Sequence, residues 1–453
     1  MEMRIERLVL ENFRGFERRE ITFSEQFTVL IGDNGSGKST ILDGLAVALG
    51  SFMAGIEGRE IRTIQSEEVR QKKIVIGEIT TMEPQLPTRV VCTGTVEGRR
   101  QTWDRSVLKV NTSGAISERA EYPSLITYAE GLREIISAGK EIKLPLLSYY
   151  GTGRMYAKKP AFGFGKRAFF PDLPTKPGSR VEGYFNCLSS GVNWRRFESW
   201  FRDKRMIELQ KQTELEILQA VRNAVSNSFE KWNAIEYDFD TKEVVAIDEE
   251  GIRLPFDMLS DGMRNMLGMV ADIAYRMATL NPHLRDRVIQ ETPGVVLIDE
   301  LDLHLHPVWQ RKVVDDLKRT FPNVQFIVTT HSPFIVQSLS EGELRWLQKE
   351  DDDERVEAEK YVNRSLEDIA ENVMEIPFPL AQRSHHLQNM YEAAQQYYDL
   401  LDQAEGASPE EIQRLKQKLD ELSAPYSDNV AYYAFLERKR LKAGLGRDDD
   451  ETD

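Results

Sequence analysis

The amino-acid sequence predicts an α/β fold with a mixed sheet at its core, and three stretches of the chain carry this prediction. A glycine-rich loop lies between a buried-strand pattern at 27–31 and an apolar-faced helix that ends near Gly50. One apolar run, at 294–298, ends in two acids, and another, at 324–330, ends in a histidine. Because a helical pattern joins the last two strands, we expect them to lie parallel in one sheet with a right-handed crossover.

The glycine-rich loop, Gly32–Thr40, fits the pattern G-x-x-x-x-G-K-[ST] of a phosphate-binding P-loop. Its glycines let consecutive backbone N–H groups turn inward on a phosphate, and the N-terminus of the following helix adds positive potential. Lys38 is expected to reach the β- and γ-phosphates, and Ser39 to ligate Mg²⁺. A glycine turn before an ordinary core helix is the alternative, which the full pattern in this context disfavours. The loop residues expected to bind ATP are Asn34, Gly35, Gly37, Lys38, Ser39 and Thr40.

Length and composition are those of a soluble globular protein. The 453 residues suffice for two or three lobes, and 41% hydrophobic with 29% charged residues is an ordinary balance. No apolar run approaches the roughly 20 residues that span a bilayer, and the first residues lack the apolar core of a signal peptide. Cys92 and Cys187 have no metal-type spacing, so the sequence predicts a cytoplasmic protein without disulfides. The net charge of −15 argues against a generally nucleic-acid-coating surface and leaves room for a local basic groove.

Shifts in composition divide the chain into four expected segments. They are 1–154, an N-lobe with the P-loop and an antiparallel sheet; 155–235, a basic-aromatic loop and helical insertion; 236–345, a C-lobe; and 346–453, a helical partner-binding region with an acidic tail.

Strands dominate the predicted N-lobe. Residues 4–10 are expected to form an edge strand that pairs with 20–23 and leads into the P-loop strand. The turn between them, Asn12–Phe16, is either a platform for the nucleotide base or a solvated hairpin turn. Further predicted elements are an antiparallel meander of strands at 73–79, 89–96 and 102–110, a helix at 125–138 and a strand at 144–150.

The predicted insertion combines basic and aromatic residues. Residues 155–185 interleave lysine and arginine with phenylalanine, as expected of a mobile surface loop or of a loop that orders on nucleic acid or a partner protein. One or two helices should follow at 194–232, with a basic cluster at their start that is either a solvated face or a DNA or partner contact.

The predicted C-lobe opens with strands between 235 and 256. A helix then begins at Leu259–Arg264, and its methionine stripe is expected to pack in the core. Another helix is predicted at 307–319, between the two apolar strands. Beyond residue 341 the pattern is polar, with helices expected at 365–374, 382–404, 408–422 and 428–443.

The acids and the histidine at the strand ends complete the expected active site. Asp299 can hold the Mg²⁺ shell through water, and Glu300 can orient or deprotonate the attacking water. His331, at the end of the neighbouring strand, can sense the γ-phosphate. Together with Lys38, these residues predict hydrolysis of ATP to ADP and phosphate.

These motifs resemble those of ABC-type ATPases of the structural-maintenance, double-strand-break-repair and RecF-like group. Ser260 and Gly262 of the signature are kept, although Asp261 and the pair Met263-Arg264 depart from the common L-S-G-G-[EQ]. The usual glutamine loop is unassigned, with Gln65 and the segment Tyr149–Arg154 as candidates. The matching motifs are Walker A at Gly32–Thr40, the signature at Leu259–Arg264, Walker B at Val295–Glu300, a D-loop about Leu301–Leu303, the switch histidine His331, and the N-terminal strand and aromatic turn at Leu10–Phe16.

The resemblance implies that the signature helix of one subunit caps the ATP held by another. Ser260 lies at a predicted helix N-terminus, which is a natural anion site, so Ser260 and Gly262 are the expected contacts. The active unit would be a head-to-tail homodimer or a higher even oligomer, closed by ATP binding and opened by hydrolysis.

The short distance between Ser39 and Leu259 leaves no room for the long coiled-coil arm of repair clamps. The runs Tyr149–Arg154 and Asp302–Gln310 and the short helical tail look most like the ATPase subunit of Septu-type and retron-linked anti-phage systems, where a separate HNH nuclease is the effector. This resemblance implies a nuclease partner, with DNA or RNA as a further candidate ligand.

Three alternatives stay open on the sequence. A RecF-like repair clamp would lack the nuclease partner, and a self-contained nuclease resembling the overcoming-lysogenization type would carry a metal site within 340–453. A transporter ATPase fits the N-terminal strand and the insertion less well. His304 and His306 favour a structural or interfacial role over zinc, since no third ligand is evident. The trigger, the nucleic-acid preference, the partner's identity and the assembly number are not determined by these patterns.

Overall fold

The computed structural model describes most of the chain up to residue 347. The described residues are 3–56, 62–76, 79–111, 116–121, 123–154, 179–228, 232–347, 413–414 and 416–417. The chain divides into two units, Met1–Met374 and Glu375–Asp453, and all elements below belong to the first. The basic-aromatic loop from 155 to 178 and the predicted helices at 365–374, 382–404 and 428–443 lie outside the described residues. Of the predicted helix 408–422, the four described residues are helical.

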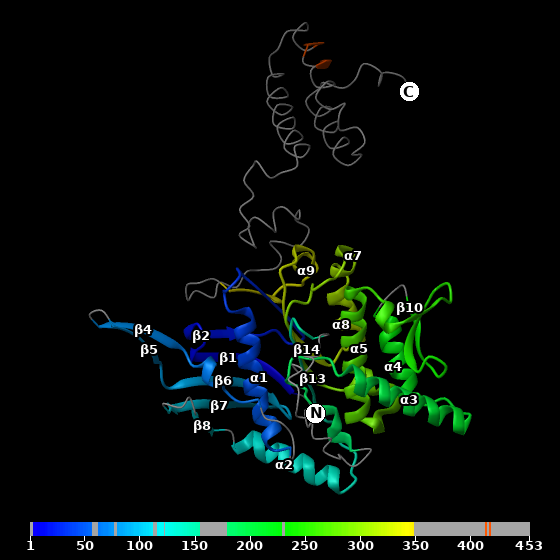
Figure 1. The fold of residues 1–453 in the computed structure, drawn as a ribbon, viewed down its shortest axis with the longest axis horizontal. Helices are drawn as coiled ribbons and strands as arrows, with labels where there is room; N and C mark the ends of the chain where they lie inside the picture. The colour runs from blue at the N-terminus through cyan, green and yellow to red at the C-terminus, as the bar shows by residue number, and fades with distance from the viewer. Residues whose placement is uncertain are drawn as a thin grey trace, which may run out of the picture. The chain divides into compact units, whose positions relative to one another are not determined.

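A parallel sheet of five strands forms the core, in the order β15-β3-β14-β13-β9 (Figure 1). Every residue of the four strands other than β15 is buried, which explains why the sequence shows continuous apolar runs there. All neighbouring strands are parallel, so their carboxyl ends meet at one edge of the sheet. The strands are β3 (Phe27–Ile31), β9 (Leu146–Tyr150), β13 (Gly294–Ile298), β14 (Val324–Thr329) and β15 (Leu344–Trp346).

Two long helices flank this sheet. The P-loop helix, α1 (Lys38–Ala54), packs near β13 and β14 and runs four residues past the predicted end at Gly50. The signature helix, α5 (Asp261–Leu280), packs near β9, with Met266, Met269 and Met277 buried as expected of core packing. In Figure 1 the antiparallel lobe lies on the α1 side of the sheet and helices α3, α4 and α8 lie on the α5 side.

The antiparallel lobe corrects one prediction. Strand β1 (Met3–Phe13) pairs with both β2 (Phe16–Thr22) and β6 (Thr88–Val96), so it is an interior strand and the predicted edge strand is wrong. The charges that favoured an edge are paired across the sheet surface, where Arg7 pairs with Glu20 at 2.5 Å and Glu6 with Arg100 at 2.8 Å. The sheet continues through β7 (Arg99–Val110) to β8 (Ile116–Glu121).

A separate hairpin replaces the first strand of the predicted meander. The predicted strand at 73–79 becomes β4 (Gln71–Ile76), which, among the described strands, pairs only with β5 (Ile79–Pro84). Five of the six β4 residues are exposed, so this strand has no apolar face with which to join the larger sheet. The predicted helix at 125–138 is confirmed as α2 (Pro123–Ser137).

The described part of the helical insertion contains two α-helices, α3 (Trp194–Lys211) and α4 (Glu216–Asn227), and the chain reverses between them where Gln212 has a left-handed φ of 50°. The predicted helix at 307–319 is broken into α7 (Pro307–Gln310) and α8 (Val313–Thr320). The remaining elements are β10 (Trp232–Asp238), β11 (Glu243–Asp248), β12 (Arg253–Pro255), α6 (Val288–Glu291), α9 (Pro333–Gln337) and the short 3₁₀ helices η1 (Ser66–Glu68), η2 (Arg180–Tyr184), η3 (Phe256–Met258) and η4 (Pro282–Arg287).

A buried ion pair joins the signature helix to the sheet. Asp272 on α5 accepts hydrogen bonds from Arg276 Nε and from the Tyr150 hydroxyl, both at 2.8 Å. Arg276 also donates to the carbonyl oxygens of Gly183 and Phe185 at 2.8 and 2.9 Å. These contacts satisfy charges that are costly to bury alone, and they fix α5 to the end of β9.

Candidate active site

The P-loop follows β3, and its backbone depends on glycine at defined positions. Gly32, Gly35 and Gly37 have φ values of 144°, 85° and 96°, which other residues rarely adopt. A Cβ on Gly37 would also lie 2.2 Å from the Phe16 ring, and one on Gly32 would lie 2.6 Å from the Leu347 carbonyl oxygen. The glycines therefore set both the path of the loop and its close contacts with neighbouring elements.

The contact between Phe16 and Gly37 places the aromatic turn of the N-lobe against the P-loop. Phe13 is fully buried and Phe16 is half-buried against the core, so this turn is more than a solvated hairpin. Its expected role as a platform for the nucleotide base stays a prediction.

Lys38 lies within the loop. Its ammonium donates to the carbonyl oxygens of Gly32 at 2.7 Å and of Asp33 at 2.9 Å. Burial lowers the pKa of Lys38, while the nearby carboxylates, Asp299 first among them, oppose this shift. The hydroxyl of Ser36 is also buried in this loop, without a hydrogen-bond partner among the described residues. The loop thus presents donors for an anionic group.

Asp299 connects the P-loop helix to the two central strands. Ser39 Oγ donates to Asp299 Oδ2 at 2.8 Å, and Thr329 Oγ1 donates to Asp299 Oδ1 at 2.6 Å. The same Thr329 hydroxyl accepts from the Glu300 backbone N–H at 2.7 Å. A serine hydroxyl beside a carboxylate offers the hard oxygen ligands that Mg²⁺ prefers, so Ser39 and Asp299 fit this ion.

Thr329 was not among the predicted site residues. The signal was present in the run Thr329-Thr330-His331-Ser332, but only the strand pairing shows which of its hydroxyls reaches Asp299.

The next turn is held by Asp302. Its Oδ1 accepts from Thr330 Oγ1 at 2.5 Å and from the backbone N–H of His331 at 3.2 Å. The His331 side chain is exposed at the end of β14, and Glu300 is half-buried at the end of β13. The structure therefore brings Lys38, Ser39, Asp299, Glu300 and His331 to the same edge of the sheet, as the sequence predicts.

Arg154 contacts the turn that follows β13 at Asp299 and Glu300, here called the Walker B turn. One guanidinium nitrogen donates to the carbonyl oxygen of Asp299 at 2.7 Å and to that of Gly151 at 3.3 Å; the other donates to the carbonyl oxygen of Glu300 at 3.1 Å. The side chain is 2% exposed, and burial lowers its pKa to about 10 against the opposing effect of Asp299, Glu300 and Asp302. It is therefore a buried cation at neutral pH.

The two candidates for the glutamine loop have different positions. The segment Tyr149–Arg154 ends β9, next to Walker B strand β13, and so reaches the edge of the sheet where the site lies. Gln65 lies beside η1, where its side chain donates to Thr63. The segment after β9 thus has the closer connection to Walker B.

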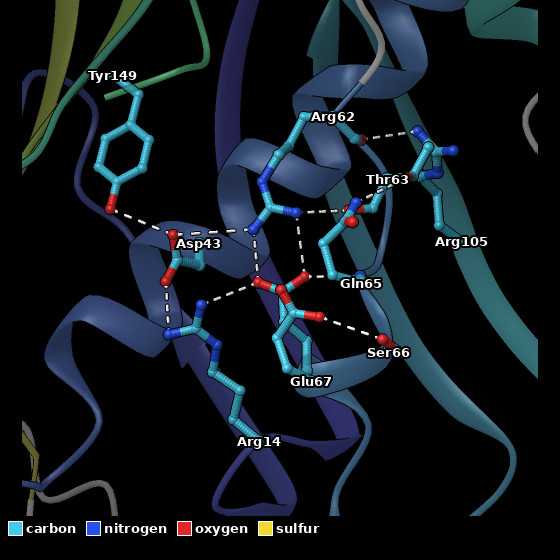
Figure 2. Close-up of polar contacts among 10 residues, drawn as sticks. Arg14, Asp43, Arg62, Thr63, Gln65, Ser66, Glu67, Arg105 and Tyr149 are labelled. Carbon is cyan, nitrogen blue, oxygen red and sulfur yellow. Dashed lines mark hydrogen bonds and ion pairs between the residues drawn. The ribbon is translucent and has the colours of Figure 1, made fainter. Parts of the chain in front are cut away.

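A cluster of ion pairs joins the P-loop helix to neighbouring elements of the chain (Figure 2). Asp43, one turn beyond Ser39 on α1, pairs with Arg14 at 2.7 Å and accepts from the Tyr149 hydroxyl at 3.3 Å. Buried Glu68 pairs with Arg14 at 3.0 Å and with Arg62 at 2.5 Å. Burial raises the pKa of Asp43, and the two arginines oppose it. The cluster ties α1 to the β1–β2 turn and to β9.

The signature residues lie at the start of α5. Ser260 is its exposed N-cap residue, and Gly262 packs so closely that a Cβ would lie 2.2 Å from the His304 carbonyl oxygen. Asn265 also donates to the Leu303 carbonyl oxygen at 3.4 Å. The signature helix and the predicted D-loop therefore form one surface, with an open pocket of about 690 Å³ lined by Ser260, His304, Leu305, His306, Pro307 and Trp309.

Within the described residues, no hydrogen bond or ion pair joins Ser260 or Gly262 to the P-loop. The two histidines of this surface have structural features: His306 accepts from the Val308 N–H as the N-cap of α7, and His304 has a left-handed φ of 61°. No group of three or more metal-binding side chains occurs in the part of the chain that the structure describes. The range 340–453, where the second alternative expects a nuclease site, lies largely outside the described residues.

A family model described as an AAA domain matches residues 7–243, and a second AAA-domain model matches 188–337. The chain belongs to the AAA domain family. Together with its P-loop, this makes the AAA-domain chain an ATPase.

Curated proteins similar to the AAA-domain chain include two retron ATPases and a Septu protein. It is 25% identical to "Retron Ec83 probable ATPase" of Escherichia coli, over 97% of this chain and 88% of that protein. It is also 25% identical to "Retron Vc95 probable ATPase" of Vibrio cholerae, over 76% of this chain and 73% of that protein. The third is the Septu protein PtuA of Bacillus mycoides, at 25% identity over 80% of this chain and 42% of that protein.

Among solved structures, the chain is similar to the SMC head domain from Thermotoga maritima. The two are 15% identical with a TM-score of 0.39, over 76% of this chain and 94% of that one. No helix in the described ranges of this AAA-domain chain has the length and apolar character to cross a membrane.

We predict that Gly37→Ala abolishes measurable ATP binding. Alanine is strained at the left-handed φ of this position, and its methyl group would overlap the Phe16 ring, so the loop or the ring must move. Gly15→Ala is the control, because that glycine has open space and no positive φ. Isothermal titration with ATP, alongside thermal unfolding, checks both; full affinity in Gly37→Ala would contradict the geometry of the loop.

Proposed function

We propose that this ATPase cleaves ATP at the edge of the sheet where Lys38, Asp299 and Glu300 meet. Lys38 binds the β- and γ-phosphates together with the backbone of Asn34, Gly35 and Gly37, and His331 contacts the γ-phosphate. Glu300 orients the attacking water and accepts its proton. The observation that carries this proposal is the link from Ser39 through Asp299 to Thr329, which places the P-loop and the Walker B acids together.

Magnesium is the cofactor that this arrangement fits. Ser39 and Asp299 would hold the ion, directly or through water. Thr40, the next residue of α1, would bind ATP with the rest of the P-loop. When bound, Mg²⁺ neutralises phosphate charge that develops during hydrolysis. The residues of the chain supply the orientation: Thr329 fixes the carboxylate of Asp299 and the backbone of Glu300 at once.

We further propose that two copies associate head to tail around two ATP molecules, as a dimer or within a higher even oligomer. Ser260 is exposed, and Gly262 packs tightly against the His304 backbone. Within the described residues, neither has a polar contact with the P-loop of its own chain. The N-terminus of a 20-residue helix at Ser260 would suit the γ-phosphate held by a second copy.

The biological role that we propose is anti-phage defence, in which this ATPase controls a separate nuclease of the HNH type. The support is the similarity to the two retron ATPases and to the Septu protein, which extends over most of this chain. ATP-driven closing and opening of the dimer would present or withdraw the surface that holds the nuclease. DNA or RNA would act as the trigger.

We predict that Glu300→Gln binds ATP with near-normal affinity but lowers turnover by about 100- to 1,000-fold, because the amide cannot accept the proton of the water. Titration with ATP and phosphate release measure the two effects separately. Glu341→Gln, in an exposed turn before β15, is the matched control with normal turnover. Normal turnover in Glu300→Gln would overturn the assignment.

We predict that two inactive variants complement each other when mixed. Lys38→Met removes a P-loop and Ser260→Arg blocks a cap, so each alone is inactive in a head-to-tail dimer. An equal mixture should recover about a quarter of the normal turnover, since half the dimers are mixed and each of those holds one intact site. If the mixture stays as inactive as its components, the pairing is wrong.

We predict that a nuclease co-purifies with the chain when it is expressed from its native operon. Mass spectrometry identifies the bound proteins, and phage challenge of cells with and without Glu300→Gln tests whether protection needs hydrolysis. A recombination protein in place of a nuclease would favour the repair clamp. Metal-dependent cutting of plasmid by the purified chain alone would favour the self-contained nuclease.

A further inference from the structure

The Walker B turn adopts a backbone that needs support. Glu300 has a left-handed φ of 49°, a conformation that side chains other than glycine rarely adopt. The turn must hold this shape for the Glu300 carboxylate to face the reacting phosphate, and a small shift of such a group has a large effect on rate. The residues that fix the turn therefore matter to the reaction even where they cannot touch ATP.

Two strands support the turn from opposite sides. On the β14 side, the Thr329 hydroxyl accepts from the Glu300 N–H, and the Leu301 N–H donates to the Thr329 carbonyl oxygen at 2.9 Å. On the β9 side, the Asp299 N–H donates to the Tyr150 carbonyl oxygen at 2.7 Å. Beyond Tyr150 the strand pairing ends, and the carbonyl oxygens of Asp299 and Glu300 are bound by Arg154 instead.

We propose that Arg154 is a positioning residue for ATP hydrolysis, which holds the backbone of Asp299 and Glu300 so that the Glu300 carboxylate is aimed at the attacking water. Its planar guanidinium carries two donors at fixed separation, which suits two consecutive carbonyl oxygens. This inference rests on the catalytic role proposed above for Glu300.

The backbone of Arg154 is itself fixed. Its N–H donates to the Gly151 carbonyl oxygen at 3.1 Å, and its carbonyl oxygen accepts from the Val192 N–H at 3.0 Å. The guanidinium also returns to Gly151, so the turn after β9 is closed on itself. A side chain that starts from a fixed backbone and is almost fully buried has little freedom to move, which is the property that a positioning residue requires.

Burial of this cation has a specific electrostatic consequence. The charges of Asp299, Glu300 and Asp302 act on Arg154, and they favour its protonated form against burial. A neutral side chain of similar length would remove both the carbonyl contacts and the positive charge among these acids. A lysine would keep the charge, but its single ammonium group lacks the rigid fork that matches two carbonyl oxygens.

The test is a double-mutant cycle between Arg154 and Glu300. We expect Arg154→Met to lower kcat about 10- to 100-fold, with the dissociation constant for ATP changed less than about threefold. Arg154→Lys should lie between Arg154→Met and the unaltered protein. In the Glu300→Gln background, Arg154→Met should cause less than about a threefold further loss, because the group that it positions is already gone.

The matched control is Arg180→Met. Arg180 likewise donates to backbone carbonyl oxygens, those of Leu280 and Ile142, but it lies outside the active site. The Arg180→Met variant should lose thermal stability without a selective loss of kcat. Thermal unfolding of every variant identifies any that fails to fold. If Arg154→Met fails to fold, Arg154→Lys replaces it in the test.

Normal kcat in a folded Arg154 variant would overturn the proposal, as would an equal loss in the presence and absence of the Glu300 carboxylate. A loss confined to ATP affinity would also overturn it. Normal turnover in Glu300→Gln alone would instead refute the catalytic assignment of Glu300. The two failures are therefore distinguishable.

Discussion

The structure depends on the parallel pairing of β3, β14, β13 and β9, which brings four carboxyl ends to one edge of a fully buried sheet. Each strand end supplies a different group: the glycine loop, two threonines and a histidine, two acids, and a buried arginine. Residues more than 250 positions apart, such as Ser39 and Asp299, become hydrogen-bonded neighbours as a result. The site needs no local sequence motif that contains all of its parts, because the sheet assembles them.

Several buried charged groups of this protein have their hydrogen-bond partners at the joints between elements. Asp272, paired with Arg276, joins α5 to β9 through the Tyr150 hydroxyl. Arg154 joins β9 to the Walker B turn, and the ion pairs of Figure 2 join α1 to the β1–β2 turn. A buried charge is costly unless its partners are well placed, so these groups specify how the elements meet. The P-loop helix and the signature helix both contact β9, through Asp43 and Asp272 respectively, so β9 supports both helices.

The chain is only about 25% identical to the retron and Septu proteins, which is compatible with a fold that requires a particular residue at few positions. Gly262 shows why Asp261 and Met263 can depart from the common signature. The glycine packs against the His304 backbone, where no side chain fits, whereas Asp261 is exposed and Met263 is half-buried. The geometry constrains the small residue and leaves its neighbours free to vary.

Local patterns alone predicted the P-loop, its helix, the strands β13 and β14 and the methionine-lined helix α5. In each of them a short run of residues determines its own conformation through burial, glycine or helical period. The same patterns could not place β1 between β2 and β6, separate the β4–β5 hairpin, reveal β15, or break the helix after Pro307, since pairing partners far along the chain decide these features.

The active-site residues divide in the same way. The sequence by itself determined Lys38, Ser39, Asp299, Glu300 and His331 as candidates, because each belongs to a motif whose spacing reflects its chemistry. Only the tertiary structure decided that Thr329 orients Asp299 and that Arg154 binds the backbone of the Walker B turn. Those contacts join a hydroxyl and a guanidinium to partners far away in the sequence. Local sequence patterns do not indicate such contacts, because the folding of the sheet brings the groups together.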